Sequence, residues 1–255
     1  MQLQAEGLSH SYGQTEVLSD INLLVESGKI VCIVGPSGCG KSTLLRLLGG
    51  LEKPVSGHVR MLGEPPPGCI NPLTYIFQDF ALLPWRSVQG NVQLALEGRG
   101  MDRVRREAIV ADVLKRTRLL DFRTALPKQL SGGMKQRVAI ARALAVSPAV
   151  LLMDEPLSAL DSQTRELLMD DLVSLWEREN VTSVYVTHNL AEAVRLGHRV
   201  VVMSRRPGVI REIVEIDLPL AQRGLGNPQL DMVQQQLWEL MRSEARAADQ
   251  ELLDV

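Results

Sequence analysis

The segment that most constrains the fold is residues 35–42, which read Gly-Pro-Ser-Gly-Cys-Gly-Lys-Ser and fit the Walker A pattern G-x-x-x-x-G-K-[ST]. An apolar run at 30–34 precedes the segment, and a leucine-rich stretch with helical spacing follows at 41–48. Glycines let the backbone wrap closely around a phosphate, and the N–H groups at a helix N-terminus favour its negative charge. A glycine-rich turn opening an ordinary helix is the simpler alternative, but it requires neither the lysine nor the hydroxyl. The segment therefore predicts a phosphate-binding loop between a strand and a helix.

Both the backbone and the side chains of this loop are expected to contact the nucleotide. We expect the Lys41 ammonium to reach the β- and γ-phosphates of a nucleotide and the Ser42 hydroxyl to ligate Mg²⁺. The residues expected to contact the nucleotide here are Gly35, Pro36, Ser37, Gly38, Cys39, Gly40, Lys41, Ser42 and Thr43.

Two acidic residues, Asp154 and Glu155, follow an apolar run at 150–153 in the manner of a Walker B motif. Taken alone, such a pair is equally typical of a solvated strand end. Next to a Walker A loop, the pattern predicts that Asp154 holds Mg²⁺ through its water shell. Glu155 is then placed to orient or deprotonate the attacking water.

The bulk composition fits an ordinary globular chain. Of the 255 residues, 45% are apolar and 23% charged, and the formal net charge is −2, which gives no whole-molecule reason for a nucleic-acid partner. The three cysteines lack metal-ligand spacing, which favours free thiols in a reducing compartment. No apolar run approaches the ~20 residues needed to cross a bilayer, and no secretory signal is visible, so we expect a cytoplasmic protein.

Short β-rich runs alternate with amphipathic helices along most of the chain, the pattern of a layered α/β domain. The β signal stops from 87 to 121, where apolar residues recur at helical spacing, so we expect a helical subdomain at about 80–130 inserted into a domain of residues 1–220. A helical tail at 221–255 follows. The expected strands are 17–25, 30–34, 59–62, 73–77, 150–153, 183–187, 199–203 and 209–216. The other expected helices are 41–48, 133–146, 162–179 and 229–247.

Residues 130–137 read Leu-Ser-Gly-Gly-Met-Lys-Gln-Arg and resemble the LSGGQ signature of ATP-binding-cassette (ABC) ATPases. A Ser-Gly-Gly helix cap would explain this stretch taken alone. However, four further positions match motifs of that family, in the family's order and spacing. They are Tyr12 in the A-loop, Gln78 in the Q-loop, Asp161 in the D-loop and the switch histidine His188. The resemblance covers about residues 1–215.

This resemblance implies an α/β fold: a P-loop NTPase (ABC ATPase) core with an antiparallel β subdomain and an inserted α-helical subdomain. The implied cofactors are ATP and Mg²⁺. Tyr12 would stack on adenine, Gln78 would act at the Mg²⁺ and the water, and His188 would contact the γ-phosphate. Residues of the signature and the D-loop would meet ATP across a head-to-tail homodimer that ATP closes. These residues are Ser131, Gly132, Gly133 and Asp161.

Two positions depart from the family pattern. Met134 stands where the signature usually has glutamine, and Asn189 follows the switch histidine where aspartate is usual. Neither departure removes a phosphate-contacting or catalytic group, so we expect an active ATPase.

Three segments resemble more narrowly the nitrate/sulfonate/taurine/bicarbonate importers: 81–88 with its LLPW run, 204–210 with an SxRPGxI pattern, and 236–240. This resemblance implies integral membrane permease subunits as direct partners and a solute-binding protein as an indirect one. It also implies a peripheral place on the inner face of the cell membrane, and uptake of a sulfonate, nitrate or similar small anion. A soluble ABC ATPase serving a non-transport assembly complex stays open as an alternative. A DNA-repair ABC ATPase is disfavoured, because only 90 positions without heptads separate Lys41 from Ser131.

Overall fold

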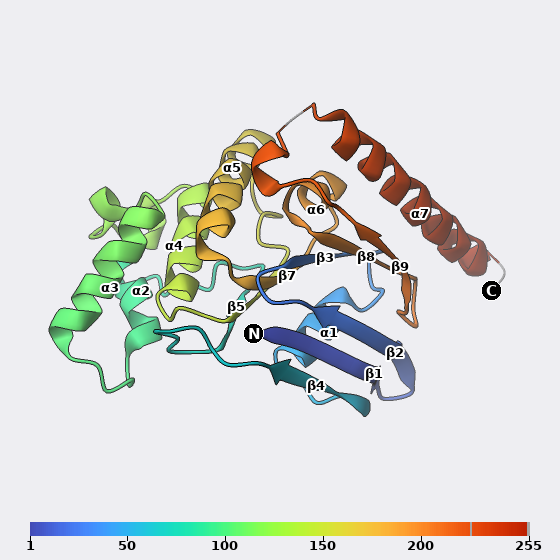
Figure 1. The fold of residues 1–255 in the computed structure, drawn as a ribbon, viewed down its shortest axis with the longest axis horizontal. Coiled ribbons are helices and arrows are strands. Elements are labelled where there is room, and N and C mark those ends of the chain that lie inside the picture. Colours follow the sequence, from blue (N-terminus) through green and yellow to red (C-terminus); the bar gives the residue numbers. More distant parts are fainter. Residues whose placement is uncertain (225, 254–255) are drawn as a thin grey trace. The chain divides into compact units, whose positions relative to one another are not determined.

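The computed structural model describes residues 1–224 and 226–253 (Figure 1). The chain forms two compact units: unit 1 joins Met1–Glu64 to Trp176–Val255, and unit 2 is Pro65–Leu175. Helix α5 (Ser162–Glu179) carries the chain from unit 2 back into unit 1. Within the described ranges, no helix combines the length and apolar character needed to cross a bilayer.

Unit 1 contains a three-stranded antiparallel sheet in the order β2-β1-β4. Its strands are β1 (Gln2–Tyr12), β2 (Thr15–Val25) and β4 (Ser56–Leu62). This sheet confirms the antiparallel β subdomain that the resemblance implied. β1 was not predicted, because Gly7 (φ +57°) lies where its register with β2 shifts and so interrupts the alternation of buried residues.

A second set of strands in unit 1 has the order β7-β3-β8-β9. β3 (Ile30–Val34) pairs in parallel with β7 (Thr182–Val186) and with β8 (Arg199–Met203), whereas β9 (Ile210–Glu215) is antiparallel to β8. Every residue of β3 and β7 is buried, as expected for parallel strands covered on both faces. Because these two strands are parallel, their carboxyl ends open on the same edge of the sheet.

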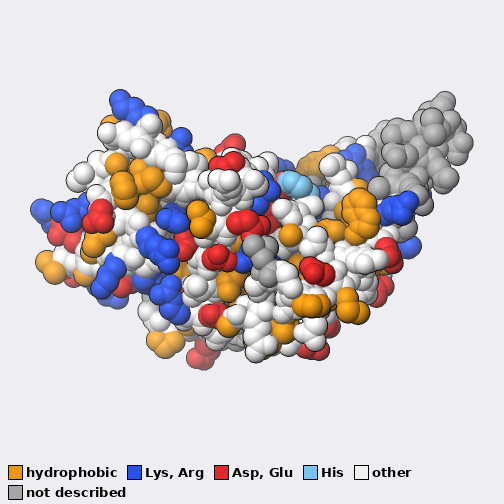
Figure 2. All heavy atoms as spheres, turned by 90° about the horizontal axis from the view of Figure 1, so that it is seen from above, with side chains coloured by type: hydrophobic (Ala, Val, Ile, Leu, Met, Phe, Trp, Pro, Cys, Tyr) orange, Lys and Arg blue, Asp and Glu red, His pale blue; other side chains and the backbone are white. Residues whose placement is uncertain are grey.

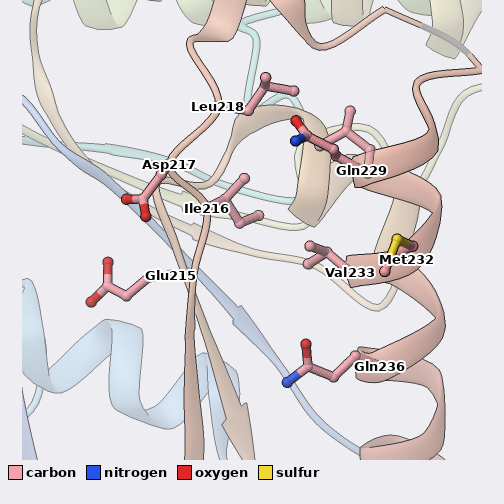
Figure 3. A pocket seen from close by; sticks show the side chains of 9 residues that line it. Glu215, Ile216, Asp217, Leu218, Gln229, Met232, Val233 and Gln236 are labelled. Carbon is pink, nitrogen blue, oxygen red and sulfur yellow. The ribbon is translucent and has the colours of Figure 1, made fainter.

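Besides the end of α5, the described part of unit 1 has three helices, α1 (Lys41–Leu48), α6 (Leu190–Leu196) and α7 (Pro228–Leu253), and a short 3₁₀ turn, η4 (Leu220–Gln222). The seven-residue α6 was not predicted, because it is too short to show a helical period. α7 packs on α6 and β8. Between α7 and the end of β9 lies a cavity of about 630 Å³ (Figure 3), where Ile216 points toward α7 and Val233 points back toward the strand, whereas Asp217 points to the other side of the strand.

Unit 2 contains the parallel pair β5 (Leu73–Ile76) and β6 (Val150–Asp154). Unit 2 also contains three mutually packed helices: α2 (Val88–Gln93), α3 (Arg103–Arg116) and α4 (Gly132–Leu144). The first two lie within residues 80–130, and α4 corresponds to the separately expected helix at 133–146. The three helices are connected through the 3₁₀ turns η1 (Leu94–Leu96), η2 (Leu120–Phe122) and η3 (Pro127–Gln129). Buried Val110, Val113 and Leu114 form the inner face of α3. Lys and Arg side chains gather over the helical part at the left of Figure 2, and those exposed on α3 include Arg103 and Arg105.

Candidate functional site

The phosphate loop leaves the carboxyl end of β3 and enters α1 at Lys41. Two of its glycines have left-handed backbone angles, Gly38 at φ +75° and Gly40 at φ +104°. A Cβ atom on Gly40 would lie 2.7 Å from the end of the Leu18 side chain of β2, and the left-handed backbone angle itself favours glycine, so a larger residue would be strained and would displace that side chain. The loop is therefore fixed by β2 on one side and by the first turn of α1 on the other. The first N–H groups of α1 have no intrahelical acceptor.

Lys41 lies inside its own loop. Its side chain is buried, and the ammonium donates hydrogen bonds to the carbonyl oxygens of Gly35 at 2.8 Å and Pro36 at 2.9 Å. Charged phosphate oxygens are stronger acceptors than these neutral carbonyls. The arrangement therefore suits an ammonium that reaches a phosphate held at the N-terminus of α1.

His188 follows β7 at the same sheet edge as the phosphate loop. The Thr187 N–H donates to the Ile33 carbonyl at 3.2 Å, which ties the end of β7 to the end of β3. Beyond it, Asn189 caps α6, with Oδ1 accepting from the Ala191 N–H at 2.9 Å. His188 itself is exposed. Unit 1 thus brings His188 and the loop of residues 35–42 to one edge of the sheet.

A buried carboxylate fixes the backbone beside His188, and sequence reasoning missed it. Glu192 is 4% exposed and accepts hydrogen bonds from the Tyr185 hydroxyl at 2.9 Å and the Thr187 hydroxyl at 2.8 Å. The second bond holds the residue that directly precedes His188. The signal in the sequence is an acid three residues after the N-cap Asn189, which a search for helix N-termini would find.

Tyr12 lies at the end of β1, and its ring is about half exposed. Its hydroxyl donates to the Glu52 carboxylate, which follows α1 and also pairs with Arg46 at 3.4 Å. The His10 and Tyr12 rings pack nearly perpendicular to each other, at a centroid distance of 4.8 Å. Tyr12 is thereby held on the side of unit 1 that carries α1, with ring surface free for stacking.

In unit 2, the acidic pair and Gln78 also meet at one edge of a parallel strand pair. Ile76 of β5 is paired with Met153 of β6, so Gln78 and Asp154 leave neighbouring strand ends. The Tyr75 hydroxyl lies 3.4 Å from the Asp154 carboxylate. Glu155 takes a left-handed backbone angle of φ +43°. Non-glycine residues in this region carry local strain that is often found at functional sites.

Ser131 caps α4: its hydroxyl accepts a hydrogen bond from the Met134 N–H at 3.3 Å. The following Gly133 packs against the segment after the D-loop, since a Cβ there would lie 2.6 Å from the Thr164 methyl. Asp161 in turn accepts from the Thr164 N–H and hydroxyl, at 2.9 and 2.7 Å, and these bonds lower the pKa of its carboxyl. The signature and the D-loop are thus neighbours within unit 2. Both are built on helix caps.

Arg142 links the segment after Gln78 to the signature helix. Its guanidinium donates to the carbonyls of Phe80 at 3.1 Å and Ala81 at 2.5 Å. Burial lowers the pKa of Arg142. This residue was not predicted as part of the site, because its partners are backbone carbonyls that no side-chain pattern reveals.

The fold and these loops define the protein's class: a nucleotide-binding P-loop ATPase that also carries a signature helix. Comparison with known proteins narrows this class. Residues 18–158 match the ABC transporter family. The chain therefore belongs to the ABC transporter family, as an ATP-binding and ATP-hydrolysing domain, and its resemblance to the nitrate and sulfonate importer group is confirmed.

Individual relatives cover most of the chain. The nitrate import ATP-binding protein NrtD of Synechocystis is 44% identical over 81% of this chain and 78% of its own length. The aliphatic sulfonates import ATP-binding protein SsuB 1 of Xanthomonas axonopodis pv. citri is 44% identical over 85% of this chain and 86% of its own. Among solved structures, a dimeric post-hydrolysis state of the ATP-binding cassette MJ0796 with ADP and Pi has a TM-score of 0.71 at 34% identity. The structural match covers 84% of this chain and 98% of the MJ0796 chain.

Proposed function

We propose that this chain is the ATPase subunit of an importer and drives uptake of a sulfonate, nitrate or similar small anion through a separate permease. The observation that carries the proposal is the similarity, over more than four fifths of the chain, to ATP-binding proteins named for nitrate and sulfonate import. In the proposed organisation, residues 1–220 form the ATPase domain, the helices at about 80–130 form an inserted subdomain, and residues 221–255 form a tail. The protein then works on the inner face of the cell membrane.

Within the proposed site, the loop Gly35–Thr43 and the α1 N-terminus bind the phosphates, and Tyr12 stacks on adenine. Ser42 supplies a hydroxyl and Asp154 a carboxylate, the hard oxygen donors that suit Mg²⁺; one or two such groups are usual, with phosphate and water oxygens completing its shell. When bound, Mg²⁺ would neutralise phosphate charge.

The proposed roles of the remaining residues concern the attacking water and the γ-phosphate. Glu155 orients or deprotonates the water, Gln78 acts beside it, and His188 contacts the γ-phosphate. The N–H groups around Ser131, Gly132 and Gly133, with Asp161, complete the site of a second subunit. The position of these residues at the N-terminus of α4 supports this role, because a helix start favours an added phosphate. Contacts made with ATP and lost with ADP would close and reopen the dimer.

The proposed permease contact is the loop that follows Gln78. Trp85 is 73% exposed there, which is unusual for so large an apolar ring. The loop is rigid, because the buried Asn91 amide accepts from the Leu83 N–H at 2.7 Å and donates to the carbonyls of Arg86 at 2.9 Å and Ser87 at 3.1 Å. An aromatic side chain on a fixed loop is suited to a protein interface.

Two experiments test the proposal. First, Glu155→Gln should lower the ATPase rate at saturating ATP at least about 100-fold and accumulate an ATP-bound dimer on size exclusion. Glu177→Gln, which replaces an exposed side chain of α5, is the control and should turn over like wild type. A rate for Glu155→Gln near wild type contradicts the assignment of Glu155.

Second, the chain should co-purify a multi-span membrane protein from detergent-solubilised native membranes. Trp85→Ala should reduce the recovery of that protein, whereas Trp238→Ala, which removes a 58% exposed ring of α7, should not. Recovery of only non-membrane partners contradicts the importer proposal and leaves the ATPase assignment intact.

A further inference from the structure

The turn that connects β8 to β9, residues 204–209, is braced by its first residue. The Ser204 N–H donates to the Val209 carbonyl at 3.0 Å, and the Val209 N–H donates back to the Ser204 hydroxyl at 3.0 Å. The same hydroxyl donates to the Arg205 carbonyl at 2.8 Å. We call this segment the 204–209 turn. Its internal bonds give it one defined shape.

The 204–209 turn is joined to β2 and pressed against the phosphate loop. The Gly208 N–H donates to the Val17 carbonyl at 2.8 Å, and the Ser19 N–H donates to the Gly208 carbonyl at 3.1 Å. A Cβ atom on Gly208 would lie 2.2 Å from the Cys39 carbonyl oxygen, so no side chain fits between the turn and the loop. The turn therefore acts as a fixed support for residues 38–40.

Arg206 extends from this support to a single atom of the phosphate loop. Its Nη2 donates to the Gly38 carbonyl oxygen at 3.0 Å, and its Nε approaches the same oxygen at 3.3 Å. Gly38 has a left-handed backbone angle of φ +75°. Glycine adopts several backbone conformations at similar energy, so without a partner this peptide group could rotate.

The orientation of that peptide group matters for binding phosphate. A phosphate loop works by presenting N–H groups to the anion, and the carbonyl oxygens of the same peptides must then point elsewhere. A carbonyl turned inward would place a negative partial charge against the phosphate. A cationic donor that holds the Gly38 carbonyl outside the loop prevents this, and its charge attracts the nucleotide.

We propose that Arg206 is a positioning residue for the phosphates of ATP and ADP: it fixes the Gly38 peptide group in the orientation that the nucleotide requires. The inference deepens the proposed function and rests on the phosphate loop being the nucleotide site. Arg206 acts through Gly38. It therefore affects nucleotide affinity more than the chemical step.

The test compares Arg206→Met, Arg206→Lys and the control Arg211→Met. Arg211 is an exposed residue of β9 that pairs with Glu244 at 3.0 Å, so its replacement removes the same charge from the same hairpin without touching the loop. Fluorescent mant-ATP and mant-ADP titrations give the affinities. Steady-state kinetics give KM and kcat, and hydrogen exchange reports the N–H groups of residues 38–43.

Loss of one charge-assisted hydrogen bond predicts about tenfold weaker binding of both nucleotides by Arg206→Met. KM for ATP should rise similarly, kcat should stay within about twofold, and exchange in the loop should speed up. Arg206→Lys retains one donor and should lie between Arg206→Met and wild type. The melting temperature should not change, which separates positioning from a general loss of structure.

Two results overturn the inference. One is Arg206→Met binding both nucleotides within about twofold of wild type. The other is Arg211→Met weakening them as much, which would show an effect of net charge alone. If wild type itself failed to bind mant-ATP, the proposed function would fail with it. A failure confined to Arg206 leaves that function standing.

Discussion

Arg223 offers the sharpest test of how unit 1 is held together. It lies between β9 and α7, is only 1% exposed, and uses its guanidinium to bond four backbone carbonyls. The distances are 2.8 Å to Leu218, 3.0 Å to Ile216 and 3.3 Å to Val194, and Gly197 is also bonded. The last two belong to the end of α6, where carbonyls have no partner within the helix. One side chain thus joins the strand end, the linker and the helix that follows His188.

The stability that the Arg223 side chain provides is the difference between two opposing free-energy contributions, its hydrogen bonds and its burial. Hydrogen bonds to a charged group contribute about 1.5–3 kcal/mol each, so four give at most about 6–12 kcal/mol. Burying the guanidinium costs several kcal/mol. The same burial lowers the pKa of Arg223 to about 10, so the group is still charged at pH 7. Methionine would keep the packing of the stem but leave the carbonyls without donors. We therefore expect Arg223→Met to destabilise the protein by about 3 kcal/mol.

Thermal unfolding followed by circular dichroism measures this loss. For a protein of this size, about 3 kcal/mol lowers the melting temperature by about 6–12 °C. Hydrogen exchange should show the amides of α6 losing protection first. Arg211→Met, an exposed replacement on β9, is the control and should change the melting temperature by less than about 2 °C. A shift that small for Arg223→Met as well would refute the reasoning that its four bonds outweigh its burial.

Two further predictions concern the neighbourhood of α6. Asn189→Asp should leave the steady-state ATPase rate within about twofold of wild type. Either side chain can accept from the Ala191 N–H, and an aspartate also suits a helix start. A tenfold fall in turnover would show that the amide itself is required. His198 accepts the Ile30 N–H at 3.0 Å, and burial with the positive charges of Arg223 and Lys29 lowers its pKa from 6.5 to about 4. Unfolding frees this imidazole to take up a proton below pH 6.5, so stability is lost as the pH falls from about 6.5 towards 4. Between pH 7 and 5, urea unfolding should show wild type losing about 1 kcal/mol more than His198→Gln, allowing for solvent screening at this partly exposed site. Equal pH dependence in the two proteins would rule His198 out as the cause.

Much of the fold could be predicted from the sequence, because most of its strands and helices show either an uninterrupted apolar run or a regular spacing of apolar residues. β3 and β6 are uninterrupted apolar runs, and α5 extends over the predicted residues 162–179. The two missed elements lack that regularity. β1 contains a glycine at a register shift, and α6 has only two turns. Their stability comes from partners distant in sequence, which a local pattern does not contain.

In the candidate site, too, some residues could be predicted from the sequence and others could not. Motif residues such as Lys41 and Ser131 stand at helix starts, and the sequence pattern of glycine, hydroxyl and helix places them there. The residues missed are the side chains that hold the motifs in place: Glu192 beneath His188, Arg142 behind the segment after Gln78, and Arg206 behind Gly38. Arg142 and Arg206 bond backbone carbonyls far along the chain, whereas Glu192 bonds two hydroxyls of the strand end that precedes its own helix. Recognising the two arginines requires the fold, and only Glu192 leaves a signal in the sequence.

The three arginines share a physical reason for being arginine. A loop that presents N–H groups to an anion, or that turns sharply between elements, leaves carbonyl oxygens on its other side. Arg206, Arg142 and Arg223 each bond such oxygens, and a planar guanidinium with five donors can hold several at once while staying charged. Lys41 works on the inner side of its loop, where a compact, mobile ammonium can leave two carbonyls for a phosphate. Exchanging arginine and lysine at these positions should therefore damage binding or stability, although the net charge is unchanged.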